Sequence, residues 1–171
     1  MDGSPGPFHI TIIRVFKDSR SPVAKVQRSL IVPYTAHEMY VLAGDVDRYE
    51  EFLPWCSASR ILESEESTIL AQVDISYKGW TTSLTTRNHM DPDSRILMTL
   101  AEGVAFESLE GLWYFKSLDA LACEVRREVD FSLSGPVGNR MLGPIVSRIC
   151  AELIEAFVER AKVLYGERAF A

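Results

Sequence analysis

The strongest constraint on the fold comes from the end of the chain, where one long apolar pattern of helical period is present. The expected helix follows Gly135-Pro136, spans about residues 137–165 and ends at Gly166. Its apolar residues form doublets four positions apart: Met141/Leu142, Ile145/Val146, Ile149/Cys150, Leu153/Ile154 and Phe157/Val158. A helix turns about 100° per residue, so a four-residue repeat precesses by about 40° at each step. The apolar stripe therefore winds around the helix, and a curved sheet can cover it while leaving part of it facing a cavity.

Short segments of alternating polarity precede this helix. We expect strands at 25–32, 61–62, 69–77, 80–89, 95–101, 109–115 and 121–133. Lys78-Gly79 and Asp91–Ser94 have the composition of tight turns. Connections of hairpin length predict an antiparallel meander and not a sheet built from βαβ units. Within the terminal helix, Pro144 predicts a kink or a restart.

Two short helices are expected between the first strand and the meander. Thr35–Glu38 matches a capping box, and Gly44 ends the first helix. Asp47 and Glu50 repeat the capping pattern for a second helix, which Pro54 stops. The break at residues 52–56, Phe-Leu-Pro-Trp-Cys, then places apolar, aromatic and thiol groups together at the expected mouth of the fold.

Length and charge limit the classes of function. A chain of 171 residues fits one domain. The net charge is −6, yet residues 1–28 carry five basic side chains against two acidic ones, so the remainder has an excess of nine negative charges. Phosphate-backbone binding depends mainly on Lys and Arg, so we expect no DNA partner.

The metal-binding and thiol chemistry of the chain is sparse. Cys56, Cys123 and Cys150 are odd in number, widely separated and form no CxxC pair, which is typical of buried thiols in a reducing compartment. His37 and His89 do not cluster with other ligand types, and we expect both to be solvated. The sequence therefore predicts no metal site.

The expected domain organisation is a flexible leader at 1–23, one folded domain at 24–166 and a tail at 167–171. The leader lacks the long apolar centre of a secretory signal. Apolar runs fall short of the ~18 residues that span a bilayer. We expect a bacterial cytoplasmic protein, which can also contact the inner membrane peripherally. A mitochondrial location is disfavoured.

The order of strand, two helices, six-strand meander and long helix is the helix-grip arrangement of START-like domains. The segments Tyr49–Cys56 and Ala156–Gly166 resemble the coenzyme Q-binding protein family, which includes the bacterial ribosome-association toxins. The resemblance covers about residues 25–166 and departs at Gly103–Phe106, where the family often has Gly-Pro-Phe. It implies an α+β, helix-grip START-like fold in which a curved antiparallel sheet wraps around a long C-terminal helix.

The resemblance also implies a function. It implies that a polyprenyl quinone (ubiquinone), or a similar lipid, binds in a hydrophobic cavity under the long helix, with no further cofactor, and that the protein supports respiratory electron transport. Such a site should be mostly hydrophobic with a few fixed donors, and each buried CH₂ of the tail contributes about 0.8 kcal/mol. The expected ligand-binding residues are Tyr49, Phe52, Leu53, Trp55, Trp80, Phe106, Trp113, Cys150, Ile154 and Phe157. Trp113 and Phe157 can instead belong to the core, Trp80 can shield a sheet end, and residues 52–55 can form a lid packed on the core.

Two other functions stay open. Family membership alone suggests a ribosome-associated toxin that binds the large ribosomal subunit and blocks 70S formation, although the acidic domain argues against it. An enzyme is the third reading, since related folds include cyclases and lyases. We find no activated nucleophile, and Asp45 and Asp47 lie at a helix junction, where capping is favoured over acid–base chemistry. Arg127, among inward apolar residues, is expected to pair with a nearby Glu, with a ligand contact as the alternative.

Overall fold

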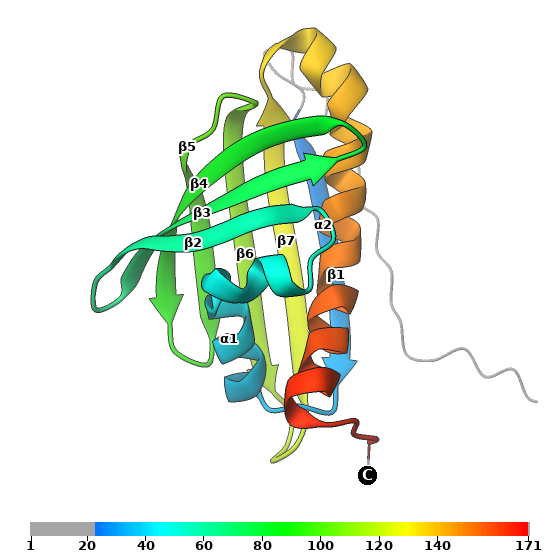
Figure 1. Ribbon diagram of the computed structural model, residues 1–171. Coiled ribbons are helices and arrows are strands. Elements are labelled where there is room, and N and C mark those ends of the chain that lie inside the picture. The colour runs from blue at the N-terminus through cyan, green and yellow to red at the C-terminus, as the bar shows by residue number, and fades with distance from the viewer. Residues whose placement is uncertain (1–22, 171) are drawn as a thin grey trace, which may run out of the picture.

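The computed structural model describes residues 23–170, in which a seven-stranded antiparallel sheet curves around one long C-terminal helix (Figure 1). The elements in chain order are β1 (Ala24–Val32), α1 (Ala36–Gly44), the 3-10 helix η1 (Val46–Glu51), β2 (Cys56–Ser64), β3 (Thr68–Tyr77), β4 (Trp80–Asp91), β5 (Arg95–Glu102), β6 (Phe106–Ser117), β7 (Cys123–Leu133) and α2 (Gly135–Tyr165). The strand order is β1-β7-β6-β5-β4-β3-β2. The predicted meander and terminal helix are therefore confirmed.

The long helix α2 lies along the sheet and packs against β1 and β7 (Figure 1). Helix α1 contacts β6 and the C-terminal part of α2. Val146, Ile149, Ile154, Phe157 and Ala161 are the buried residues of α2. In the predicted doublets, the residues Val146, Ile149, Ile154 and Phe157 are thus buried in the core, and most of their doublet partners are partly exposed along the winding stripe.

The core is divided into two hydrophobic clusters. The larger cluster lies under α1 and η1 and includes Trp113 and Phe157. The smaller one contains Phe106, Val129, Phe131, Leu133 and Val146. Strand β7 contributes to both, because its inward residues are buried at alternate positions along the whole strand.

Some predicted elements differ from the structure. The strand expected at 61–62 is the nine-residue β2, whose register breaks between Cys56 and Ala58 and again between Ile61 and Glu63. These irregularities disrupt the alternation by which a strand is recognised. The capping box of Thr35 and Glu38 is confirmed. The second capping prediction is wrong: η1 has no side-chain cap.

Asp47, the expected cap of η1, accepts a hydrogen bond from the Ile61 amide of β2 at 2.7 Å. Of the two outcomes predicted for Pro144, the restart is wrong, since α2 runs through that residue as one helix, and the kink stays a prediction. Pro144 lies in the exposed early part of α2. A lost backbone donor is better tolerated there than in the packed interior, because water can satisfy the freed carbonyl.

Across residues 23–170, no helix combines the length and the apolar character needed to cross a bilayer. The expected leader, apart from Val23, lies outside the described residues. Near the other terminus, Arg168 donates two hydrogen bonds to the Glu38 carboxylate, each at 2.9 Å. The segment after α2 is therefore held against the start of α1.

Candidate functional site

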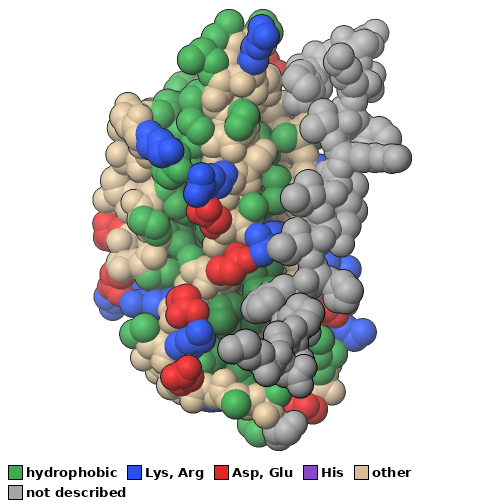
Figure 2. Space-filling model, turned by 90° about the vertical axis from the view of Figure 1, so that its right-hand side faces the viewer, with side chains coloured by type: hydrophobic (Ala, Val, Ile, Leu, Met, Phe, Trp, Pro, Cys, Tyr) green, Lys and Arg blue, Asp and Glu red, His purple; other side chains and the backbone are tan. Residues whose placement is uncertain are grey.

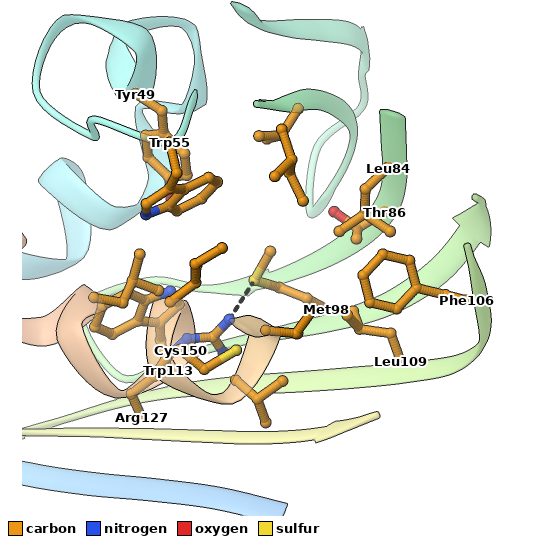
Figure 3. Close-up of a pocket in the computed structure, with 16 residues that line it drawn as sticks. Tyr49, Trp55, Leu84, Thr86, Met98, Phe106, Leu109, Trp113, Arg127 and Cys150 are labelled. Atoms are coloured by element: carbon orange, nitrogen blue, oxygen red, sulfur yellow. Dashed lines mark hydrogen bonds between the residues drawn. The ribbon is translucent and has the colours of Figure 1, made fainter. Parts of the chain in front are cut away.

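An apolar cavity of about 90 Å³ lies between the concave face of the sheet and α2 (Figure 3). It separates the two core clusters, since members of both line it. The lining residues are Tyr49, Trp55, Val73, Ile75, Leu84, Thr86, Met98, Phe106, Leu109, Trp113, Arg127, Val129, Val146, Ile149, Cys150 and Leu153.

Three parts of the fold build this cavity. Strands β3 to β7 supply the concave wall, and α2 supplies the opposite wall through Val146, Ile149, Cys150 and Leu153. The η1 helix and the connection to β2 supply Tyr49 and Trp55 at one end. The cavity therefore exists because the sheet curves away from α2 between the two core clusters.

Five of the ten expected ligand-binding residues line this cavity. They are Tyr49, Trp55, Phe106, Trp113 and Cys150. Their convergence follows from the topology, which brings η1, β6 and α2 together. Whether any of them touches a ligand stays a prediction.

The structure places the other five expected residues outside the lining. Leu53, Ile154 and Phe157 are each 1% exposed and belong to the larger core cluster. Phe52 packs edge-on against Phe157, with ring centroids 5.1 Å apart. Trp80 is half-buried and packs against the smaller cluster. These side chains support the ends of the cavity.

Tyr49 presents its ring to the cavity but not a free hydroxyl. Its hydroxyl donates to the backbone carbonyl of Ala43. Burial raises the pKa of Tyr49 well above its ordinary value, so the phenol stays neutral. Trp113 is also enclosed, with its ring centroid 4.9 Å from that of Phe157. The two aromatic residues therefore offer apolar ring surface.

Arg127 is the one charged residue among those that line the cavity, and it is only 7% exposed. Its guanidinium lies over the Trp113 ring, 5.0 Å from the centroid. One terminal nitrogen donates to the Glu128 carbonyl at 3.2 Å and the other contacts Met98 Sδ at 3.6 Å (dashed in Figure 3). Its Nε has no partner among the described residues.

The predicted ion pair between Arg127 and a glutamate is wrong. No ion pair between residues of the described part of the chain includes Arg127. Successive side chains of a strand point to opposite faces, so neighbouring Glu128 lies on the outer face, where its carboxylate is 3.4 Å from Arg126. The charge of Arg127 is therefore left inside an apolar lining.

Gly111 on β6 gives the guanidinium its space. A Cβ on this residue would come within 2.7 Å of Arg127 Nη1 and 2.9 Å of Nη2. Gly111 pairs with Val129 of β7 on one side and with Met98 of β5 on the other. The sequence pattern did not reveal this role, since a glycine inside a strand shows only that something approaches closely.

The end of the cavity near Trp55 is tied to α2. Arg160 of α2 donates to Glu51 of η1 at 2.5 Å, and its guanidinium lies 5.2 Å from the Phe52 ring centroid. Trp55 and Leu153, which face the cavity on this side, are half-buried. This arrangement makes η1 and its connection to β2 a cover whose position depends on α2.

The size of the cavity bears directly on what can enter. An apolar cavity of about 150 Å³ admits benzene. The observed volume is smaller, so a ring with a long tail needs lining side chains to move apart. Trp55, Met98 and Leu153 are among the half-buried lining residues that can do so, because they are less tightly enclosed than the core.

Comparisons with known proteins agree with this geometry. The family model described as polyketide cyclase / dehydrase and lipid transport matches residues 32–158. "Ribosome association toxin RatA" of Pseudomonas aeruginosa is 40% identical over 82% of this chain and 97% of its own length. "Coenzyme Q-binding protein coq10, mitochondrial" of Schizosaccharomyces pombe is 25% identical over 79% of this chain and 85% of its own.

Solved structures share the architecture. The Zhui aromatase/cyclase of Streptomyces sp. R1128 has a TM-score of 0.75 at 19% identity, over 85% of this chain and 99% of that one. A START superfamily protein of Mycobacterium smegmatis has a TM-score of 0.69 at 19% identity, over 82% and 98%. These similarities confirm the expected helix-grip START-like fold, which is found in enzymes as well as in other proteins.

Proposed function

Because this chain belongs to the polyketide cyclase / dehydrase and lipid transport family, we propose that it is a non-catalytic protein that holds a lipid in the cavity beside α2. The observation that carries the proposal is the cavity itself, which is lined almost wholly by apolar and aromatic side chains. Sites of this composition bind largely hydrophobic molecules and use a few polar groups to orient them.

A polyprenyl quinone such as ubiquinone is the ligand we propose first, with the protein acting as its carrier in support of respiratory electron transport. The similarity to a coenzyme Q-binding protein supports this choice. The half-buried Trp55 offers a flat surface to a ring, and a tail can leave beside the half-buried Leu153. No Asp, Glu or His belongs to the described lining, which favours binding over acid–base catalysis.

The test is to purify the protein from a ubiquinone-producing bacterium, extract it with organic solvent and analyse the extract by mass spectrometry. The proposal predicts co-purified quinone with the wild type. Ile149→Phe should reduce the yield by about tenfold, because the larger ring fills cavity space that the ligand needs. Val163→Phe is the matched control, since Val163 is exposed on the same helix. Wild-type protein free of any lipid would contradict the proposal.

Association with the ribosome is the second candidate. The 40% identity to a protein named as a ribosome association toxin favours it. In this form the chain would bind the large ribosomal subunit and block 70S formation. Overexpression followed by sucrose-gradient analysis should then lower the 70S peak and raise the free subunits. An unchanged 70S peak would dismiss this candidate.

A further inference from the structure

The buried guanidinium of Arg127 is an unusual group to find in an apolar cavity. Arginine has five N–H donors and remains charged in proteins. Here one donor reaches a backbone carbonyl, another reaches only a thioether sulfur, and Nε reaches no acceptor within the described chain. Burying a charge without a counter-charge is costly, so the site is incomplete as it stands.

Within residues 23–170, the side chains around Arg127 supply no counter-charge. Burial raises the pKa of the Cys150 thiol to about 11, although Arg127 opposes the shift, so this thiol is neutral at physiological pH. The buried Tyr49 phenol is neutral as well and already donates to Ala43. Trp113 contributes a ring face, which attracts a cation but does not neutralise it.

The backbone next to Arg127 is shaped to keep its head in place. Only a residue without a Cβ fits at position 111 with the guanidinium where it is. Trp113, directly opposite Arg127 in the strand register, supports the guanidinium plane. The charged head is thus held beside the cavity, where an incoming group can meet it (Figure 3).

We infer that the ligand of this cavity carries an ionised oxygen acid, with a carboxylate as the simplest case, which accepts hydrogen bonds from Arg127 while its apolar body lies among the other lining residues. The inference rests on the proposed lipid-binding function and places an acidic lipid ahead of the neutral quinone as the ligand. A neutral quinone carbonyl can accept from the same N–H groups but leaves the charge uncompensated. Arginine recognises carboxylates by charge-assisted, often bidentate hydrogen bonds.

The experiment compares probes with equal or similar apolar bodies. Dodecanoate, methyl dodecanoate and a short-tailed ubiquinone analogue are each titrated into the full chain below their aggregation concentrations, by isothermal calorimetry at pH 7.5. Dodecanoate should bind about tenfold or more tightly than its methyl ester, because only the acid offers a charged acceptor. The neutral quinone should bind like the ester.

Two variants connect this preference to the residue. Arg127→Met should bring the affinity for dodecanoate down to that for the ester, and Arg127→Lys should retain part of the preference. Gly111→Ala, which displaces the guanidinium without removing it, should weaken dodecanoate and leave the ester nearly unchanged. The glycine variant gives an independent reading if Arg127→Met fails to fold.

The outcomes separate the two proposals. If the wild type binds the acid, the ester and the quinone equally, the inferred acid head is wrong and the lipid-binding function stands. A preference for the acid that survives both Arg127→Met and Gly111→Ala also overturns the inference. If no probe binds, the lipid-binding proposal fails and the inference fails with it.

Discussion

At the scale of single residues, Gly111 and Arg127 depend on each other. The guanidinium occupies the volume that any side chain at position 111 would need. Alternation along a strand predicts that Arg127 points inward, and the structure confirms it. The ion pair expected for Arg127 is wrong, because the same alternation places the neighbouring glutamates on the outer face of the sheet. The partnership with Gly111 needs the register of β6 and β7, which no local pattern shows.

Replacing Gly111 tests this partnership. We expect Gly111→Ala to lower the free energy of unfolding by about 1–3 kcal/mol, because the new methyl group overpacks against the guanidinium. Adding Arg127→Met should recover much of this loss, since the clashing atoms are gone. Urea denaturation of the single and double variants measures the coupling.

Gly143→Ala serves as the control for that series. Gly143 lies in α2, and a Cβ added there would meet no neighbouring group within 4 Å. The change should raise stability by about 0.5–1 kcal/mol, because alanine loses less backbone entropy than glycine. Equal destabilisation by Gly111→Ala with and without Arg127 would show that the two residues are independent.

Glu38 is the residue whose protonation should affect stability. It accepts from the Thr35 amide at 2.9 Å and twice from Arg168. The hydrogen bonds from Arg168, followed by the one from the Thr35 amide, hold the pKa of Glu38 below its ordinary value, although burial opposes them. A carboxyl whose pKa is lower in the folded state stabilises the fold above its unfolded pKa of about 4.3. This contribution is lost as the pH falls through the folded pKa.

Glu38→Gln should therefore lower the free energy of unfolding by about 1 kcal/mol at neutral pH, which is typical for loss of a cap interaction. The difference from the wild type should shrink as the pH falls from the unfolded pKa of about 4.3 through the lower pKa of the folded carboxyl, below which the wild-type side chain is protonated too. Urea denaturation across this pH range checks it. Arg168→Met, which removes the hydrogen bonds from Arg168 but keeps the capping box of Thr35 and Glu38, is the control. A difference that stays constant with pH would contradict this account.

At the scale of elements, α2 was the most predictable part of the chain and β2 the least. A winding apolar stripe needs a curved partner, and the structure has one. The stripe also predicted that helix residues would face a cavity, which Val146, Ile149, Cys150 and Leu153 do. The bulges in β2 disrupt its alternating pattern, so the sequence predicted only a short part of this strand. Periodicity could not show which aromatic residues would face the cavity and which would fill the core. Phe157 and Trp113 are in contact with each other, yet only Trp113 lines the cavity.

The contact between η1 and α2 should control how fast a ligand exchanges. Arg160→Met removes the bond to Glu51 while keeping an apolar stem near Phe52. Ligand release, followed by stopped-flow tryptophan fluorescence, should become about threefold to fivefold faster, the scale of one partly exposed ion pair. Arg148→Met, which breaks an exposed pair with Glu152 on the same helix, is the control. Equal release rates in the two variants would show that η1 does not cover the cavity.

At the scale of the whole molecule, the end of the fold at the start of α2 exposes several apolar side chains beside the charged Arg140. Val104, in the loop before β6, and Val137 and Met141, in the first turns of α2, are exposed. The Ser134 hydroxyl donates to the Val104 carbonyl at 2.9 Å, which joins the loop to the start of the helix. Figure 2 shows hydrophobic side chains at this end of the visible face. The proposed function requires a lipid to pass to and from a membrane, and we expect this end of the fold to make that peripheral contact.

The double variant Val137→Glu/Met141→Glu should slow transfer of a bound lipid to anionic phospholipid vesicles by about tenfold, because two exposed apolar side chains that would enter the membrane are replaced by charges that the anionic surface repels. Its affinity for the ligand should be unchanged. Val163→Glu, exposed near the other end of α2, is the control. Transfer at the wild-type rate by the double variant would exclude this end as the membrane contact.

A crystal structure of the full chain saturated with dodecanoate would show whether an acidic lipid binds on Arg127 beside α2. We predict a ligand enclosed between β3–β7 and α2, with its carboxylate on Arg127, its chain along Trp113 and Cys150, and Trp55 or Leu153 displaced from its present position. A cavity that keeps its present volume of about 90 Å³, with the ligand bound elsewhere on the surface, would contradict the account.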